Sequence, residues 1–108
     1  MLKIRPEVLT DPSDIHRVHT LAFERPNEAA FVDALRRDGI LTVSLVAEQA
    51  QHMVGHIAFS PVTIISNMTT IEAIGLGPVA VLPDYQRQGI GSQLVHRASA
   101  FNLSHQHL

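Results

Sequence analysis

Apolar residues in the N-terminal third of the chain follow a short alternating start and then recur at helical spacing. The alternation over Leu2–Arg5 predicts a strand, which ends at Pro6 because proline cannot donate to a ladder. Asp11 and Pro12 are typical of a helix start, where an Asp side chain caps free amides and proline fits the first turn. The apolar stripe of this helix is predicted at Ile15, Val18 and Ala22.

A second helix is predicted directly after the first. It is expected to begin near Asn27 and to end at Gly39, because glycine readily adopts the left-handed conformation that ends many helices. Its buried side chains are predicted to be Phe31, Ala34 and Leu35.

After Gly39 the apolar period changes from about 3.6 to about 2, which predicts strands. One strand is expected from Leu41 to Ala47. A connection at 48–51 then leads into a second strand over Met53–Val62, with Ile57 and Phe59 on the face opposite His56. The connection lacks the glycine or asparagine that usually marks a hairpin, and a polar loop is expected over 66–70.

The segment Ala73–Leu82 has a strand pattern whose parity shifts part-way along. Its apolar residues are even-numbered at first (Ile74 and Leu76) and odd-numbered afterwards (Val79 and Val81). Side chains alternate strictly along a strand, so a regular strand cannot bury both pairs on one face. A β-bulge at Gly77-Pro78 would restore one buried face, and such bulges are common beside active sites. The alternative is a strand that ends at Gly77 and starts again.

The segment 83–92, which contains two glycines at positions 89 and 91, connects this strand to an amphipathic helix. The apolar side of the helix is predicted to contain Ile90, Leu94, Val95, Ala98 and Phe101. Free N–H groups and the positive end of the helix dipole favour an anion at this junction, and Arg87 adds a positive charge. No lysine follows the glycines, so the loop is not a P-loop, and the acidic residue of a dinucleotide fingerprint is missing.

Composition limits the remaining possibilities. The chain has 108 residues, room for one domain over 1–108, and a formal net charge of −2, which argues against a nucleic-acid-binding surface. It contains no cysteine, so thiol nucleophiles and thiolate metal sites are excluded. No apolar run reaches the ~18 residues of a membrane span, and the N-terminus lacks a secretory signal. We expect a soluble cytoplasmic domain without a metal ion.

The spacing Gln86-x-x-Gly89-x-Gly91 between a shifted strand and a helix resembles the signature of the GNAT superfamily of acetyl-CoA-dependent N-acetyltransferases. The longer run from Gly75 to Ser92, together with residues 55–62, resembles the YhbS-like branch of that superfamily. The similarity covers nearly the whole chain up to about Phe101. It implies the α/β acyl-CoA N-acyltransferase fold, in which a mixed, mostly antiparallel sheet is flanked by helices.

The resemblance also implies a cosubstrate and a reaction. The backbone of Val79, Ala80 and Val81 would bind the pantetheine arm of acetyl-CoA. The pyrophosphate would be held by the loop residues Gln86, Arg87, Gln88, Gly89, Ile90, Gly91 and Ser92. The acetyl group would pass to a primary amine of a small molecule or protein by direct attack, with no covalent enzyme intermediate. The acceptor and the catalytic residues are not assigned.

Members of the superfamily usually continue after this helix with a strand, a helix and a strand pair, for which the 108 residues leave no room. The resemblance therefore implies a shortened member whose exposed strand edge favours self-association, for example as a homodimer. Two alternatives to an active enzyme remain open at this point. One is a coenzyme A-binding module without catalysis, and the other is a fragment that folds only by pairing with another copy.

Several further residues are candidates for chemistry, each beside a plainer interpretation. His16 and His19 have the spacing of a ligand pair, but ordinary packing is the alternative. His56 or Glu72 is a candidate base, against a structural histidine or a solvated acid. Arg25 and Glu28 lie where the superfamily shapes its acceptor pocket. Tyr85 is the only tyrosine and lies in the loop, so it is not assigned as the acid that protonates the thiolate.

Overall fold

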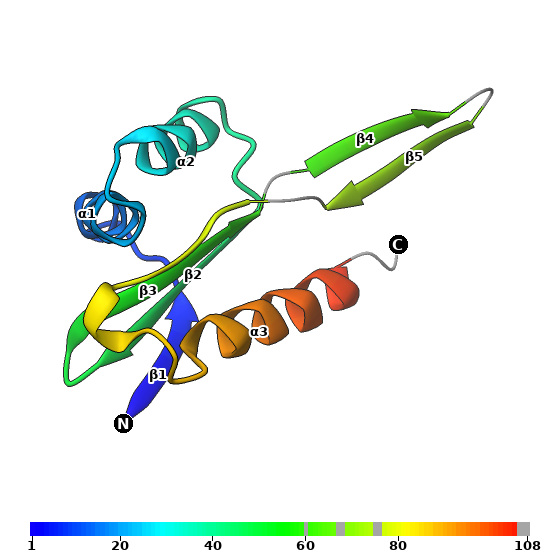
Figure 1. The fold of residues 1–108 in the computed structure, drawn as a ribbon. Coiled ribbons are helices and arrows are strands. Elements are labelled where there is room, and N and C mark those ends of the chain that lie inside the picture. Colours follow the sequence, from blue (N-terminus) through cyan, green and yellow to red (C-terminus); the bar gives the residue numbers. More distant parts are fainter. Residues whose placement is uncertain (60, 67–68, 75–76, 106–108) are drawn as a thin grey trace.

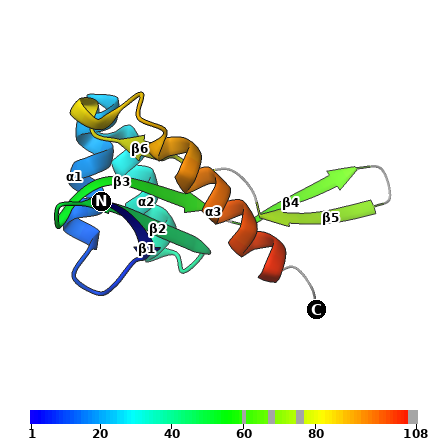
Figure 2. The same cartoon turned by 90° about the horizontal axis from the view of Figure 1, so that it is seen from below.

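A four-stranded antiparallel sheet with helices on both faces forms the body of the molecule (Figure 1). The computed structural model describes residues 1–59, 61–66, 69–74 and 77–105. The sheet order is β1 (Leu2–Pro6), β2 (Val43–Gln49), β3 (His52–Phe59) and β6 (Val79–Val81). Helices α1 (Pro12–Phe23) and α2 (Asn27–Arg37) cover one face, and α3 (Ile90–His105) covers the other (Figure 2).

The two N-terminal helices form where the sequence predicts them but bury partly different residues. Helix α1 buries Ile15 and Val18, as predicted, and also His19. Helix α2 buries Ala29, Val32 and Leu35, whereas the predicted Phe31 is 47% exposed. Leu35 is buried as predicted, but the prediction of Phe31 was wrong because it relied on the size of this side chain. The helix phase set by Leu35 buries smaller residues one and two turns earlier and turns Phe31 to solvent.

The ends of these helices show one wrong and one correct prediction. Asp11 occupies the N-cap position of α1 but makes no side-chain cap. Its carboxylate instead accepts hydrogen bonds from the Arg5 guanidinium and the Val8 N–H, because the guanidinium offers two charged donors to the two carboxylate oxygens at once. Helix α2 stops as predicted, with Gly39 at φ +73° and the Ile40 N–H bonded to the Leu35 carbonyl at 3.0 Å.

Strands β2 and β3 form the predicted hairpin. The turn between them is tight and holds Ala50 at φ 52° and Gln51 at φ 66°. Two consecutive left-handed residues are typical of a type I′ turn, which usually contains glycine or asparagine. The register places Ile57 in the core under α3 and His56 on the α1 side, as predicted.

A second, two-stranded sheet extends from the body and makes the molecule 48 Å long (Figures 1 and 2). It pairs β4 (Pro61–Ser66) with β5 (Thr69–Ile74). The continuous strand predicted over Ala73–Leu82 is therefore wrong, because β5 and β6 belong to different sheets. The interrupted alternative describes the chain better. The predicted loop at 66–70 is also shorter, since Ser66 pairs with Thr69.

The predicted shift in parity is nevertheless present. The last pair of the main sheet joins Ile57 to Val79, and the first pair of the second sheet joins Pro61 to Ile74. Between these two pairs, the segment that leads from β3 to β4 has three residues, 58–60, and the segment that leads from β5 to β6 has four, 75–78. One extra residue therefore separates the two registers, as the change from even to odd apolar positions predicts.

Candidate functional site

A loop with unpaired backbone amides joins β6 to α3. It starts with a short 3₁₀ turn, η1 (Pro83–Tyr85), and ends where α3 begins at Ile90. Within the described residues, no acceptor faces the amides of Arg87 to Ser92, and the first bonded amide is that of Gln93, 3.0 Å from the Gly89 carbonyl. The positive end of the α3 dipole lies at the same place. The loop can therefore hold an anion through its backbone, as the sequence predicts.

The backbone of this loop is left-handed at two positions. Arg87 has φ 65° and Gly89 has φ 82°. A Cβ atom built at Gly89 meets nothing within 4 Å, so a side chain there would project into open space beside the amides. The side chains of residues 86–89 are exposed, while that of Ile90 is buried and anchors the loop to the core.

Gln86, the first residue of the signature, acts on the strand rather than on the open space. Its Nε2 donates to the Val81 carbonyl at 2.9 Å. This bond ties the start of the loop to the end of β6. The loop and the strand edge are thereby held in a fixed relation before any ligand arrives.

Strand β6 has one paired and one open edge in the described part of the chain. The Leu82 N–H bonds the Val54 carbonyl at 2.8 Å, and the Ala58 N–H bonds the Pro78 carbonyl at 3.2 Å. Bonds alternate along an antiparallel pair, so Ala80 also bonds inward to its partner His56. The N–H groups of Val79 and Val81 consequently point to the open edge, where an extended ligand could add as a strand.

A pocket of about 610 Å³ borders the end of β6. Its walls are the C-terminal half of α1, the turn into α2, and the segment from Leu82 to Tyr85. Two carboxylates, Glu24 and Asp84, line the pocket together with Arg17 and Arg25. The pocket therefore combines apolar side chains with side chains of both charges, at the point where the chain leaves β6 and enters the loop.

Comparison with known proteins matches residues 41–108 to the family described as the acetyltransferase (GNAT) domain. This chain belongs to the GNAT acetyltransferase family. It is 37% identical over 94 residues to the uncharacterized N-acetyltransferase YhbS of Escherichia coli strain K12, which covers 86% of this chain and 55% of YhbS. It is 38% identical over 88 residues to YjhQ of the same strain, covering 80% and 49%. The chain thus spans about half the length of these relatives.

Two solved structures share the fold of this GNAT chain. A GNAT family acetyltransferase from Brucella melitensis, in complex with acetyl-CoA, has a TM-score of 0.83 and 38% identity, over 96% of this chain and 70% of that one. YhbS from E. coli in complex with CoA has a TM-score of 0.75 and 34% identity, over 90% and 53%. The predicted fold class is therefore confirmed.

The candidate base His56 is a buried residue of this GNAT domain. Its side chain and that of His19 are both 0% exposed, and His19 Nε2 lies 2.9 Å from His56 Nδ1. Burial lowers the pKa of His19 to about 4 and that of His56 to about 3. A base for an incoming amine must be reachable, so the structural interpretation of His56 holds. His19 faces this partner while His16 bonds Asp33, so the two do not form a ligand pair.

The remaining candidates lie apart from one another. Arg25 lines the pocket and pairs with Glu28 through Nε at 2.9 Å, which lowers the pKa of that carboxyl. Glu72 lies in β5, whose side chains are outside the described residues. Tyr85 lines the same pocket as Arg25 and packs against the core under α3.

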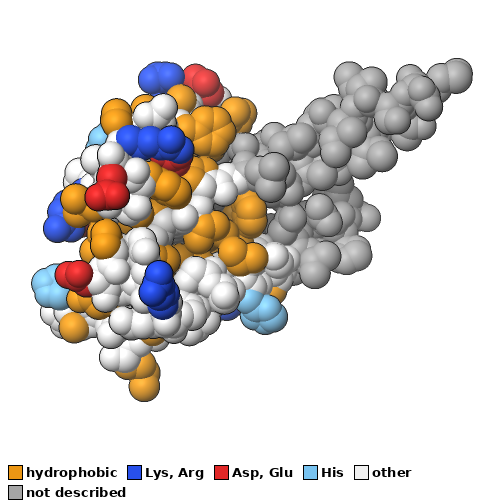
Figure 3. Space-filling model, viewed as in Figure 1, with side chains coloured by type: hydrophobic (Ala, Val, Ile, Leu, Met, Phe, Trp, Pro, Cys, Tyr) orange, Lys and Arg blue, Asp and Glu red, His pale blue; other side chains and the backbone are white. Residues whose placement is uncertain are grey.

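Neither a cluster of metal-binding side chains nor a membrane-spanning helix occurs in the described ranges. No group of three His, Cys, Asp or Glu side chains that could hold a metal ion occurs there. No helix in this part of the chain is both long and apolar enough to cross a membrane. On the face seen in Figure 3, Lys and Arg side chains are spread among acidic ones and do not form one basic patch.

The sequence missed two features of this site. The bond from Gln86 to Val81 has no periodic signal, because it depends on how the loop folds back. The polar chain that connects His19 and His56 to Ser44 and Glu7 joins residues far apart in sequence. No local pattern signals it, because the two histidines belong to different elements, α1 and β3.

Proposed function

We propose that this chain carries the acetyl-CoA-binding part of an N-acetyltransferase that acetylates a primary amine. The proposal depends chiefly on the unpaired amides of Arg87–Ser92 at the start of α3, beside the open edge of β6. Complexes of two relatives with acetyl-CoA and CoA support it. The amides would hold the pyrophosphate, with Gln86, Arg87 and Gln88 forming the outer wall of the loop.

The strand edge would bind the pantetheine arm. The N–H groups of Val79 and Val81 are free to donate to its amide carbonyls, whereas Ala80 is bonded to β3 and keeps the edge straight. Acetyl-CoA supplies an acetyl group already activated as a thioester. A neutral amine held beside it would attack the carbonyl carbon. The C–N bond would form as the C–S bond breaks, and CoA would leave as its thiol after it takes up a proton equivalent to the one that the amine loses. The protein's contribution would be orientation and this transfer of a proton.

The acceptor site is proposed in the pocket of about 610 Å³ next to β6. Glu24 and Asp84 line it and would attract an amine, which is cationic before it reacts. Arg25 and its partner Glu28 would form the rim of the pocket.

Self-association and a cytoplasmic location stay predictions of the sequence. Sedimentation at increasing protein concentration tests self-association.

Ligand-induced stabilisation, compared in two glycine variants, tests the proposed binding site. Gly89 and Gly39 both have positive φ, and a Cβ at either meets nothing within 4 Å, so Gly89→Ala and Gly39→Ala carry matched backbone strain. Acetyl-CoA at about 100 times its Kd stabilises a folded protein by ~2.7 kcal/mol. We expect this gain in the wild type and in Gly39→Ala but a much smaller gain in Gly89→Ala.

A nucleotide without the pantetheine arm, such as ATP, serves as the ligand control. Equal stabilisation of both variants by acetyl-CoA would place the ligand elsewhere and contradict the proposal. Release of free thiol from acetyl-CoA on addition of amines then separates catalysis from binding alone. Binding without thiol release would leave a coenzyme-binding module.

A further inference from the structure

We propose that a chain of hydrogen-bonded side chains, which begins with two buried and neutral histidines, latches α1 and α2 onto the sheet and that acid opens this latch. The chain runs from His19 of α1 through His56 of β3 and Ser44 of β2 to Glu7, which precedes α1, and ends at Arg36 of α2. It is independent of the acetyl-CoA site and of any acceptor.

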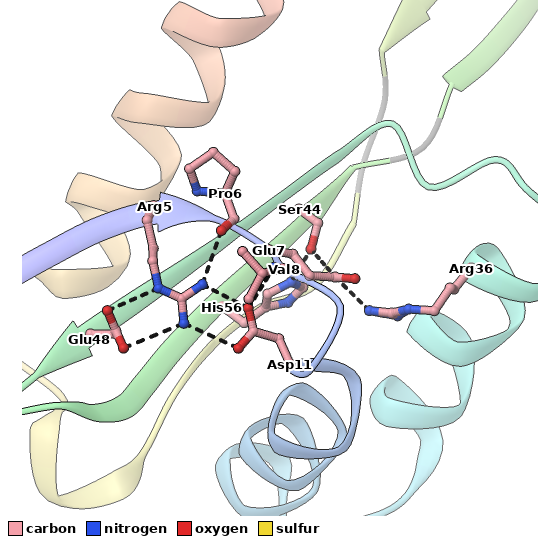
Figure 4. Close-up of polar contacts among 9 residues, drawn as sticks. All are labelled: Arg5, Pro6, Glu7, Val8, Asp11, Arg36, Ser44, Glu48 and His56. Carbon is pink, nitrogen blue, oxygen red and sulfur yellow. Dashed lines mark hydrogen bonds and ion pairs between the residues drawn. The ribbon is translucent and has the colours of Figure 1, made fainter.

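Short, consecutive hydrogen bonds connect the members. His19 Nε2 is 2.9 Å from His56 Nδ1, and His56 Nε2 is 2.8 Å from the Ser44 hydroxyl. That hydroxyl donates to Glu7 Oε1 at 2.5 Å, and Arg36 Nη2 donates to the same oxygen at 2.6 Å. Figure 4 shows the central part, where Glu7, Ser44, His56 and Arg36 converge from four separate segments. The chain is thus a polar path through the layer between helices and sheet.

The order of protons along the path follows from what each group can donate. An ionised Glu7 only accepts, so the single hydroxyl proton of Ser44 is used toward it. Ser44 must then accept from His56 Nε2–H, which leaves His56 Nδ1 as an acceptor. His19 therefore donates through Nε2–H, and its Nδ1 carries no proton. The three hydrogen bonds between His19 and Glu7 therefore all donate in the direction of Glu7, and Arg36 donates to Glu7 from the other end.

A second proton on either histidine has no favourable place. On His56 it would go to Nδ1 and face the N–H of His19, so the bond between α1 and β3 would be lost. On His19 it would go to Nδ1, which is buried and has no partner among the described residues. Either protonation therefore leaves a buried charge, and protonation of His56 also removes the hydrogen bond from His19.

The surrounding charges do not offset this cost. The carboxylates nearest His19 belong to Glu28 and Asp33 of α2, which already pair with Arg25 and His16. Around His56 lie Asp11, which is bonded to Arg5, the cationic Arg36, and His19 itself. Desolvation is the main cause that holds the pKa of each histidine below its ordinary value of 6.5.

The direction of the pH effect follows from this depression. In the unfolded chain both histidines take up protons below about pH 6.5, while in the folded protein they stay neutral until much lower pH. Stability is therefore fully present above pH 6.5 and falls as the pH drops below it. Between pH 6 and 5, each histidine raises the unfolding equilibrium constant by about sevenfold.

Proton NMR of the wild-type histidine rings tests the latch directly. We expect the resonances of His19 and His56 to stay unchanged from pH 8 to pH 5, because both rings remain neutral in the folded protein. Titration of either buried ring with a midpoint near 6.5 in the folded protein would overturn the proposal.

A variant pair measures the energetic side. His19→Gln keeps a side-chain N–H donor for His56 but cannot be protonated, and His96→Gln makes the same change on an exposed position of α3. We expect the change in unfolding constant between pH 6 and 5, from urea titrations, to be about sevenfold smaller in His19→Gln and unchanged in His96→Gln. Equal pH dependence in all three proteins would refute the latch. If His19→Gln does not fold, the NMR titration decides.

Discussion

The two faces of the main sheet are built in different ways. Under α3 the core is apolar, formed by Val43, Leu45, Ala47, Val54, Ile57, Ile90, Leu94 and Ala98. Under α1 and α2 the apolar cluster is smaller, with Ile15, Val32, Val46 and Ala58, and buried polar groups lie beside it. The α3 face thus depends on shape and apolar area, while the α1–α2 face depends also on protonation states.

This difference predicts that the two faces respond differently to pH. Apolar burial does not change with pH, so the side of the molecule that carries the proposed anion-binding loop is expected to keep its geometry over a wide pH range. Hydrogen-bonded buried groups are satisfied in one protonation state and costly in another. The side that lines the pocket with α1 therefore responds to acid first.

The largest expected loss of stability comes from a substitution in the apolar core under α3. Leu94 is 0% exposed in the centre of that core, and Leu94→Ala should lower the free energy of unfolding by about 3 kcal/mol, since truncation leaves a cavity. Val95→Ala, one residue along α3 but 43% exposed, is the matched control and should cost about 0.5 kcal/mol or less. Urea unfolding at pH 7.5 measures both. Similar losses in the two variants would contradict the assignment of this core.

A smaller effect is expected on the polar face. Ser44→Ala removes the hydroxyl between His56 and Glu7 and leaves the His56 Nε2–H without its acceptor, which should cost about 2 kcal/mol. Ser44→Thr keeps the hydroxyl and should lose clearly less. The same urea titrations apply. A larger loss in Ser44→Ala than in Leu94→Ala would reverse the ranking of the two faces.

The smallest effect concerns the margin of the polar face, where Arg5 bridges Asp11 and Glu48 (Figure 4). Glu48→Gln removes one partly exposed ion pair but leaves Arg5 bound to Asp11, so about 0.5 kcal/mol should be lost at pH 7. Arg5 holds the pKa of Glu48 below its usual 4.5, so this contribution is present above pH 4.5 and disappears as the pH falls through the lowered pKa. A difference that persists at pH 3 would speak against the ion pair as its cause.

Local patterns predicted most of the fold. The change of apolar period located the helices and the β2–β3 hairpin, and Gly39 marked the end of α2. The stripe of α2 was misjudged, because the phase of a short helix is set by the sheet beneath it and not by its largest residue. The parity shift near Gly77 was visible, but whether it lies in one strand or between two sheets depends on long-range pairing.

The site divides in the same way. A contiguous loop such as 86–92 can be recognised from spacing alone, because its proposed function depends on backbone amides and on the glycines that expose them. The pocket beside Tyr85 and the chain from His19 to Glu7 join distant segments. Their residue types have many ordinary uses, so only the folded arrangement distinguishes them.

The tight turn between β2 and β3 is a place where the stability of this protein can be raised. Alanine and glutamine at positions 50 and 51 hold a backbone conformation that costs an L-residue roughly 1 kcal/mol each relative to its preferred regions. The sequence has therefore left stabilisation unused at a site that neither contributes to the loop nor touches the buried histidines. An engineer seeking a hardier variant should begin at this corner, since a gain there leaves both layers of the domain unaltered.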